Sequence, residues 1–265
     1  MIPSLIRKSL RDYRRAVAGW MIGIGVFVTI YVSSWSQFKG DPEAAESAAD
    51  RIPQGMQTAL AFQDLSSGAG YLQAVIYTVF VPLLLIMAAT VFGARAIAGP
   101  EDAGVLDLLL ANPISRRRFV LQRFAALTVA VVAVGAVVWL LVLALAAALE
   151  MNVGASRISA ASLGLLLVGL CFGTLALTVS AFVGRRPVVL ATTGSVAVAT
   201  YLLHALGNQF DAVRPLRWLS PFHYYLGADP LHTGFHVGYL LVLAGIIAVL
   251  VGAAAAAFER RDLAV

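Results

Sequence analysis

The side chains best suited to chemistry gather in one segment, FHYYLGADPLHTGFH, which runs from Phe222 to His236. His232 and His236 are four residues apart, so a helix would place both on one face. His223 and Asp229 belong to the same segment. A zinc ion takes three or four such ligands, but the aromatic, Pro and Gly residues around them are ordinary interface and turn residues. We therefore predict no metal site and expect a short re-entrant or interfacial piece that caps one end of the protein.

The rest of the chain offers no catalytic arrangement. A membrane enzyme would need His, Asp, Ser or metal ligands at catalytic spacing, and here they are scattered. The single cysteine, Cys171, excludes an intrachain disulfide. A P-loop needs a lysine after a glycine-rich loop, yet the two lysines, Lys8 and Lys39, stand in IRKSL and QFKGD. We therefore predict that this chain is not an ATPase and binds no cofactor of its own.

The composition indicates a membrane protein. The chain has 265 residues, of which 60% are hydrophobic and 12% charged, and its mean hydropathy is +0.85. A soluble domain carries about 25% charged residues. The formal net charge is +5, but the basic residues flank apolar runs and form no patch on a soluble domain, which argues against nucleic acid as a partner. We predict an all-α integral membrane protein.

Six apolar runs approach the ~20 residues that a bilayer requires. We predict transmembrane helices over 16–36, 71–98, 124–149, 160–183, 188–208 and 237–258. All six belong to one domain that covers residues 1–265. The 37–70 loop is either a substrate-related lid or a plain connector, and the sequence leaves both open.

Basic residues predict the orientation of these helices. If both termini and the second and fourth loops face the cytoplasm, that side holds 14 of the 19 Lys and Arg residues. Cytoplasmic loops collect Lys and Arg. We therefore predict that both termini are cytoplasmic, as an even number of spans requires.

The first fifteen residues predict an amphipathic helix at the inner membrane surface. Leu5, Ile6, Leu10 and Tyr13 fall on one helical face. The opposite face carries the cations that we expect to contact anionic lipid headgroups: Arg7, Lys8, Arg11, Arg14 and Arg15. The alternative is a merely solvated basic flank.

The predicted spans contain almost no ionisable groups. Arg95 and Glu150 lie near span ends, and His204 is the one titratable side chain of the fifth span. A proton- or sodium-driven carrier generally needs a carboxylate or an unwound site near the midplane. A stand-alone carrier or channel remains the alternative, but we expect the energy to come from elsewhere.

The segment GPEDAGVLDLLLANPISRRRF, from Gly99 to Phe119, predicts a docking helix over 100–112. Pro100 suits a first helical turn, acidic residues follow where the helix dipole favours them, and Asn112 with Pro113 ends the helix. The helix is too short to span a membrane and too apolar to remain in water. It therefore needs a partner, or the membrane interface in the alternative interpretation.

Three segments resemble those of ABC-2-type transporter permeases. EDAGVLDLLLANPISRRR is similar to the family's E-E-x-G-T-L…LL-x-x-P-[IV]-S-R segment, with Val105 where the family often has Thr. WLSPFHYYLGADPL and the terminal FERRDL look like its outer loop and C-terminal signature. With the six spans, the resemblance covers nearly the whole chain.

This resemblance implies a permease subunit of a bacterial ABC exporter in the cytoplasmic membrane. It implies separate ATP-binding subunits that hold ATP and Mg, and a second permease copy or a paralogue. The 100–112 helix would be a coupling helix seated in the ATPase, and its expected contacts are Glu101, Asp102, Gly104, Val105, Leu106 and Leu109. The apolar spans suggest a lipophilic substrate.

Two small-xxx-small pairs permit close helix contact. They are Gly19 with Gly23 in the first span and Gly169 with Gly173 in the fourth. The sequence leaves open whether either pair joins two permease copies or packs within one bundle.

Overall fold

The structure is a computed structural model that describes residues 3–39, 43, 47, 64–102 and 115–261. Within these residues the backbone forms helices and turns and contains no strand, which confirms the all-α prediction. The elements are α1 (Pro3–Ser33), η1 (Ser34–Gln37), α4 (Gly68–Leu72), η2 (Gln73–Thr78), α5 (Phe80–Ala96), α6 (Ala98–Asp102), α8 (Arg116–Ala148), α9 (Ala155–Val183), α10 (Arg186–Gln209), η3 (Asp211–Leu219), α11 (Pro221–Leu226), α12 (Pro230–Thr233) and α13 (Val237–Arg260).

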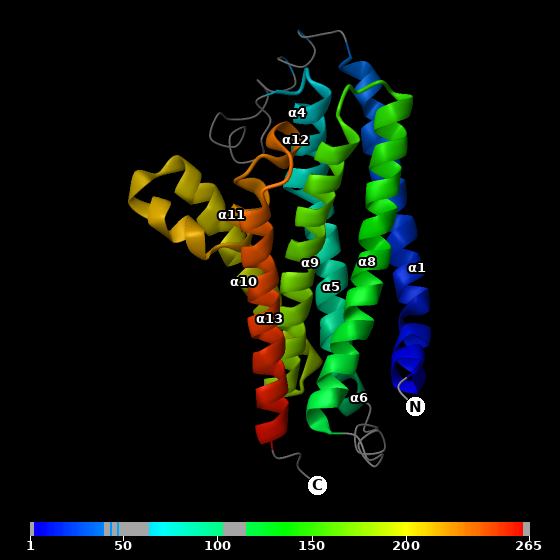
Figure 1. Ribbon diagram of the computed structural model, residues 1–265, viewed down its shortest axis with the longest axis vertical. Coiled ribbons are helices and arrows are strands. Elements are labelled where there is room, and N and C mark those ends of the chain that lie inside the picture. Colours follow the sequence, from blue (N-terminus) through cyan, green and yellow to red (C-terminus); the bar gives the residue numbers. More distant parts are fainter. Residues whose placement is uncertain (1–2, 40–42, 44–46, 48–63, 103–114, 262–265) are drawn as a thin grey trace.

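Six helices of the described chain are long and apolar enough to cross a membrane, as predicted. They are Tyr13–Gln37, Gly68–Ala96, Arg116–Ala148, Ala155–Val183, Arg186–Asn208 and Val237–Arg260. They run side by side along the long axis of the molecule (Figure 1). The start of α1 and the end of α13 lie at the same end, here named the lower end after its place in Figure 1, and α4 and α12 lie at the upper end.

The helix α9 is the centre of the bundle. It packs against α5, α13, α8 and α10, while α1 packs mainly on α8. The contact between α5 and α9 is close because glycines form it: a Cβ on Gly173 would lie 3.1 Å from the Cβ of Ala89, and one on Gly169 would lie 3.0 Å from Leu85. The pair Gly169 and Gly173 therefore packs within the bundle. Gly19 and Gly23 have open space beside them.

The second spanning segment is broken near its upper end, which the sequence analysis did not predict. Gln73–Thr78 forms a π-helix, η2, before α5 begins at Phe80. Pro82 has no N–H to donate to the carbonyl of Thr78, so the regular hydrogen-bond ladder cannot continue there. Within the π-helix, the hydroxyl of Thr78 donates to the carbonyl oxygen of Gln73 at 2.7 Å.

The third spanning helix, α8, begins at Arg116, eight residues before the predicted span. Ser115 is its N-cap, and its hydroxyl accepts from the backbone N–H of Arg118. Capping satisfies an orphan donor and so favours helix formation through the polar RRR sequence. Hydropathy indicates where a helix enters the membrane, whereas the cap determines where the helix begins.

The chain between α10 and α13 folds into three short helices at the upper half of the bundle. The upper part of α10 and η3 lean away from the other helices, on the left of Figure 1. In contrast, α11 packs against α9, α13 and α10 and buries Phe222, His223 and Tyr225. The structure thus places FHYYL between spanning helices.

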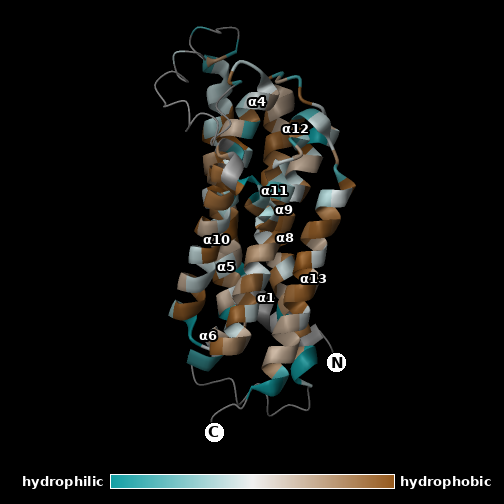
Figure 2. Ribbon diagram, turned by 90° about the vertical axis from the view of Figure 1, so that its left-hand side faces the viewer, coloured by the Kyte–Doolittle hydropathy of each residue, from teal (hydrophilic) through white to brown (hydrophobic). Residues whose placement is uncertain are grey.

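Hydrophobic residues predominate in the spanning helices along most of the height of the bundle (Figure 2). Large apolar side chains stand exposed on different spanning helices, including Ile22, Leu140 and Val249. In water such surface would be a site of aggregation. Around membrane-spanning helices it faces lipid.

Candidate functional site

The first acidic residue of the predicted docking segment is bound within the chain. Glu101, in α6, accepts two hydrogen bonds from the guanidinium of Arg261, just beyond α13, at 2.9 and 2.5 Å. Both side chains are mostly buried, at 28% and 20% exposed. A bidentate Arg–carboxylate pair fixes orientation as well as distance. It therefore fastens the end of α6 to the end of α13.

The second acidic residue reaches a different element. One carboxylate oxygen of Asp102 lies 3.4 Å from the backbone N–H of Arg186, which opens α10. Between α9 and α10 stands Gly184, with φ of +68°. A Cβ on Gly184 would collide with the carboxylate of Glu101 and with the guanidinium of Arg261. The turn needs glycine both for its backbone angle and for this close approach.

Arg116, the first residue of α8, binds the end of α13 in the same region. Its guanidinium donates to the carbonyl oxygen of Arg261 at 2.5 Å, with longer contacts to those of Phe258 and Glu259. These carbonyls belong to the end of α13, where a helix leaves acceptors without intrahelical partners. The rings of Phe119 in α8 and Phe258 in α13 are stacked, with centroids 5.6 Å apart, and add an apolar contact between the same two helices.

The junction between α5 and α6 is also held by α9. The hydroxyl of Ser180 accepts from the backbone N–H of Ala98 at 2.9 Å and reaches the carbonyl oxygen of Ala94. We call the group of Glu101, Asp102, Gly184, Arg116 and Arg261 the lower-end cluster. It joins the ends of α6, α8, α9, α10 and α13 at the point where the chain enters residues 103–114.

The other predicted ATPase contacts, Gly104, Val105, Leu106 and Leu109, lie outside the described residues. The coupling helix over 100–112 therefore stays a prediction, of which only the start, α6, is described. The roles of Arg261 and Arg116 were not predicted from the sequence. The signal was present, because both belong to motifs, FERRDL and ISRRR, that share the family resemblance.

The predicted inner-leaflet residues belong to one continuous helix, α1, which runs without a break from Pro3 to Ser33. Arg14 and Arg15 are exposed on it. The side chains of Arg7, Lys8 and Arg11 are outside the described part of the structure. Contact of this helix with lipid headgroups stays a prediction.

The histidines singled out by sequence are not brought together as a group. Among the described residues no three His, Cys, Asp or Glu side chains lie close enough to hold a metal ion. His223 is buried against the ring of Trp218, at 4.5 Å between centroids, and its nearest histidine is His204, at 6.2 Å. Burial, and then the charge of Arg217, lowers the pKa of His223.

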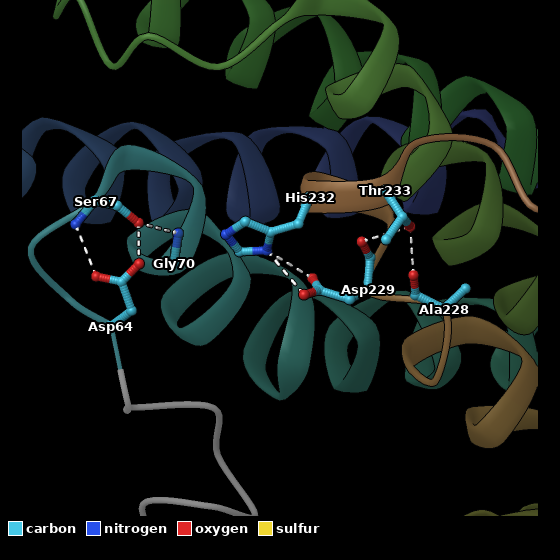
Figure 3. A network of polar contacts seen from close by, with 7 residues as sticks. All are labelled: Asp64, Ser67, Gly70, Ala228, Asp229, His232 and Thr233. Carbon is cyan, nitrogen blue, oxygen red and sulfur yellow. Dashed lines mark hydrogen bonds and ion pairs between the residues drawn. The ribbon is translucent and has the colours of Figure 1, made fainter.

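His232 instead belongs to a polar network at the upper end (Figure 3). Its Nδ1 lies 2.9 Å from the carboxylate of Asp229. Asp64, three residues before the N-cap of α4, accepts from Ser66 and from both the backbone N–H and the hydroxyl of Ser67. Burial alone would raise the pKa of Asp64, but these hydrogen bonds outweigh it and hold the pKa below its ordinary value. These hydrogen bonds stay within 64–70 on one side and within 228–233 on the other, while α4 and α12 are in contact and the charge of His232 adds a smaller lowering of the pKa of Asp64.

An apolar cavity of about 230 Å³ opens between α5 and α10. It lies beside the π-helix, which contributes Thr78, and Pro82, Tyr201 and Phe222 also line it. π-Helical turns are frequent at functional sites. The cavity has almost no polar surface, so it suits a lipophilic ligand.

The fold and the lower-end cluster define a class of protein: a multi-pass α-helical membrane protein with a fastened polar junction between its second and third spans. The model of the ABC-2 family transporter proteins matches residues 4–263. The chain therefore belongs to the ABC-2 family of transporter proteins, and it is a membrane permease subunit of an ABC transporter. A search of curated proteins finds no relative similar enough to count as a match.

Proposed function

We propose that this permease exports a lipophilic substrate across the bacterial cytoplasmic membrane, driven by ATP hydrolysis in separate subunits. The lower end faces the cytoplasm, as the distribution of Lys and Arg favours. The observation that carries the proposal is the lower-end cluster. An ion pair to Arg261 and a backbone hydrogen bond from Arg186 tie the start of the predicted coupling segment to α13 and α10, and Arg116 links α8 to the same end of α13.

This arrangement suits the transmission of force. ATP binding closes the partner subunits, and the closure moves the 100–112 segments that sit on them. Since Glu101 is bound to Arg261, α6 carries α13 with it, and α5 follows because α6 continues from it. A rigid junction passes a small displacement to the spanning helices because packed helices shift as units.

The cavity between α5 and α10 supports a lipophilic cargo. Its lining offers hydrocarbon and aromatic surface from Pro82, Tyr201 and Phe222. Among the six spanning helices as described, α10 is the least buried, so its exposed face is where we expect the second permease copy or paralogue. The two copies would then enclose the path between them.

The test is co-purification. The chain, tagged, is co-expressed with the ATP-binding protein encoded beside it and isolated in mild detergent. We expect the ATP-binding protein to be retained, and the replacement of Gly104 and Leu106 by Glu to abolish retention while membrane insertion persists. Arg260→Glu is the matched control, because Arg260 is exposed at the same end and outside the cluster.

Retention of the ATP-binding protein by the Gly104/Leu106 variant, with ATPase stimulation intact, would refute the coupling helix. Absence of the ATP-binding protein even from native lipid discs would instead favour a stand-alone carrier. Transport of a lipophilic dye into inverted vesicles, dependent on ATP, tests the direction.

A further inference from the structure

A second cavity, apart from the one between α5 and α10, lies between α8 and α9. This α8–α9 groove has a volume of about 320 Å³, larger than the cavity between α5 and α10. Gly135 and Trp139 of α8, Ser159, Ser162 and Leu166 of α9, and Phe235 of the connection before α13 form part of its wall. Nothing in the proposed transport mechanism uses it.

Gly135 lies in the wall of the groove and close to Leu166 across it. A Cβ at this position would lie 3.0 Å from Cδ1 of Leu166, so a larger side chain here would crowd the wall. Phe235, which is half-exposed, also lines the groove. It follows Gly234, whose φ of +85° is a backbone angle that glycine adopts without strain. Gly135 and Phe235 thus stand on different elements that line the same groove.

The polar atoms in the groove wall already have partners. The indole N–H of Trp139 donates to the hydroxyl of Ser159 at 3.0 Å, and that hydroxyl donates to the carbonyl oxygen of Ala155. The hydroxyl of Ser162 pairs with that of Tyr77 at 2.8 Å. The polar atoms of this wall are thus engaged with one another, and the remaining lining residues offer mainly hydrocarbon to an occupant.

The groove lies on the membrane-spanning part of both helices. It extends over eight residues of α9, from Ser159 to Leu166, which is about 10 Å along the axis. Val132 and Leu163, which line it, are exposed, so the groove is continuous with the lipid-facing surface. An elongated hydrocarbon chain fits this shape and setting.

We propose that the α8–α9 groove binds one acyl chain of a phospholipid of the surrounding bilayer, in the leaflet nearer the upper end. The chain fills the space beside Gly135 under the ring of Phe235. Because Ser162 is bonded to Tyr77, and Tyr77 accepts from the hydroxyl of Tyr225 at 2.7 Å, the lipid braces the packing of α9 on the π-helix and α11.

A second copy of the chain is the competing occupant. Its natural place is α10, which among the described spans buries the smallest share of its length, whereas α9 is one of the two most buried. The groove proposal does not rest on ATP-driven transport, so the two can fail separately.

The experiment titrates the purified full-length chain, without an ATP-binding partner, with dioleoylphosphatidylglycerol in detergent and counts bound lipids by native mass spectrometry. We expect one tightly bound lipid per chain. Gly135→Leu fills the groove and should weaken this binding at least tenfold. Gly245→Leu, on α13 where a Cβ meets open space, is the matched control and should change it less than twofold.

A second measurement does not depend on the folding of Gly135→Leu. Phospholipid with brominated acyl chains should quench the fluorescence of wild-type protein with a 1:1 endpoint, and Trp139→Phe should remove that component. Equal lipid binding by Gly135→Leu and Gly245→Leu, or quenching without an endpoint, overturns the proposal. A dimer that becomes monomeric in Gly135→Leu with lipid binding unchanged would assign the groove to a second copy.

Discussion

At the residue scale, the lower-end cluster depends on two features. One is the ion pair of Glu101 with Arg261, which joins residues 160 positions apart in the chain. The other is Gly184, which turns the chain from α9 to α10 without a side chain in the space that this pair occupies. Each can be removed by one substitution.

Replacement of either member of the ion pair should destabilise the junction and uncouple ATP hydrolysis from transport. Glu101→Gln and Arg261→Gln each leave a mostly buried partner unpaired, which costs about 1–3 kcal/mol of the free energy of unfolding. In a double-mutant cycle, measured by thermal unfolding in detergent, we expect a coupling energy of about 1–2 kcal/mol. Additive effects of the two substitutions would show that the pair contributes nothing.

Gly184→Ala should be destabilising. The residue lies in the left-handed region, which costs an L-residue roughly 1–2 kcal/mol, and the new Cβ would also displace Glu101 and Arg261. Gly252→Ala is the control, because Gly252 lies within α13 with open space beside it. The measurement is the unfolding temperature of each variant, and equal temperatures would contradict the strain assigned to the turn.

At the element scale, the packing of α5 on α9 sets the geometry of the bundle. These helices approach closely at Gly93, where a Cβ would collide with the carbonyl oxygen of Gly173 and lie 2.8 Å from the Cβ of Ala176. Small residues at helix interfaces permit this approach in membranes, where dispersion and shape fit replace the hydrophobic effect. The π-helix η2 directly precedes α5, and Ser180 of α9 bonds to the backbone at the other end of α5.

Gly93→Ala should therefore disturb the bundle more than an ordinary added methyl group. Overpacking of a tight contact costs typically about 1–3 kcal/mol, which we expect as a lower unfolding temperature and a smaller yield of monodisperse protein. Gly252→Ala, on α13 with open space, should leave both unchanged. If the two variants behave alike, α5 and α9 have room to separate.

At the scale of the whole molecule, the two ends of the bundle differ in chemistry. The lower end gathers the Arg-rich cluster, and the upper end holds the caps α4 and α12 with Asp64, Asp229 and His232. Lys39 lies at the upper end too, where it pairs with Glu150 at 3.0 Å. The orientation that we propose puts the lower end in the cytoplasm.

Cysteine labelling tests this orientation. Cys171 is buried, so it should not react, and single cysteines can be added to the natural chain. Ser156→Cys, at the exposed start of α9, should react with a membrane-impermeant maleimide in intact cells. Arg260→Cys, at the lower end, should react only after permeabilisation. The reverse pattern would invert the topology.

The sequence alone determined the class of protein, the six spans and the location of both chain ends on one side. These three features depend on local hydropathy over about 20 residues, which can be read from contiguous sequence. The family resemblance likewise rests on contiguous motifs. The span boundaries shifted by several residues, as where α8 begins at Arg116 behind its cap Ser115 and α9 begins at Ala155 before the predicted 160.

Only the tertiary structure decided what these elements do together. The pairing of Glu101 with Arg261, the internal use of Gly169 and Gly173, and the groove beside Gly135 all depend on how helices distant in sequence are rotated and aligned. Periodicity identifies the apolar residues of a helix, but in a membrane almost every face is apolar. Shape and a few hydrogen bonds then select the partner of each face, and they act between residues that the sequence does not bring together.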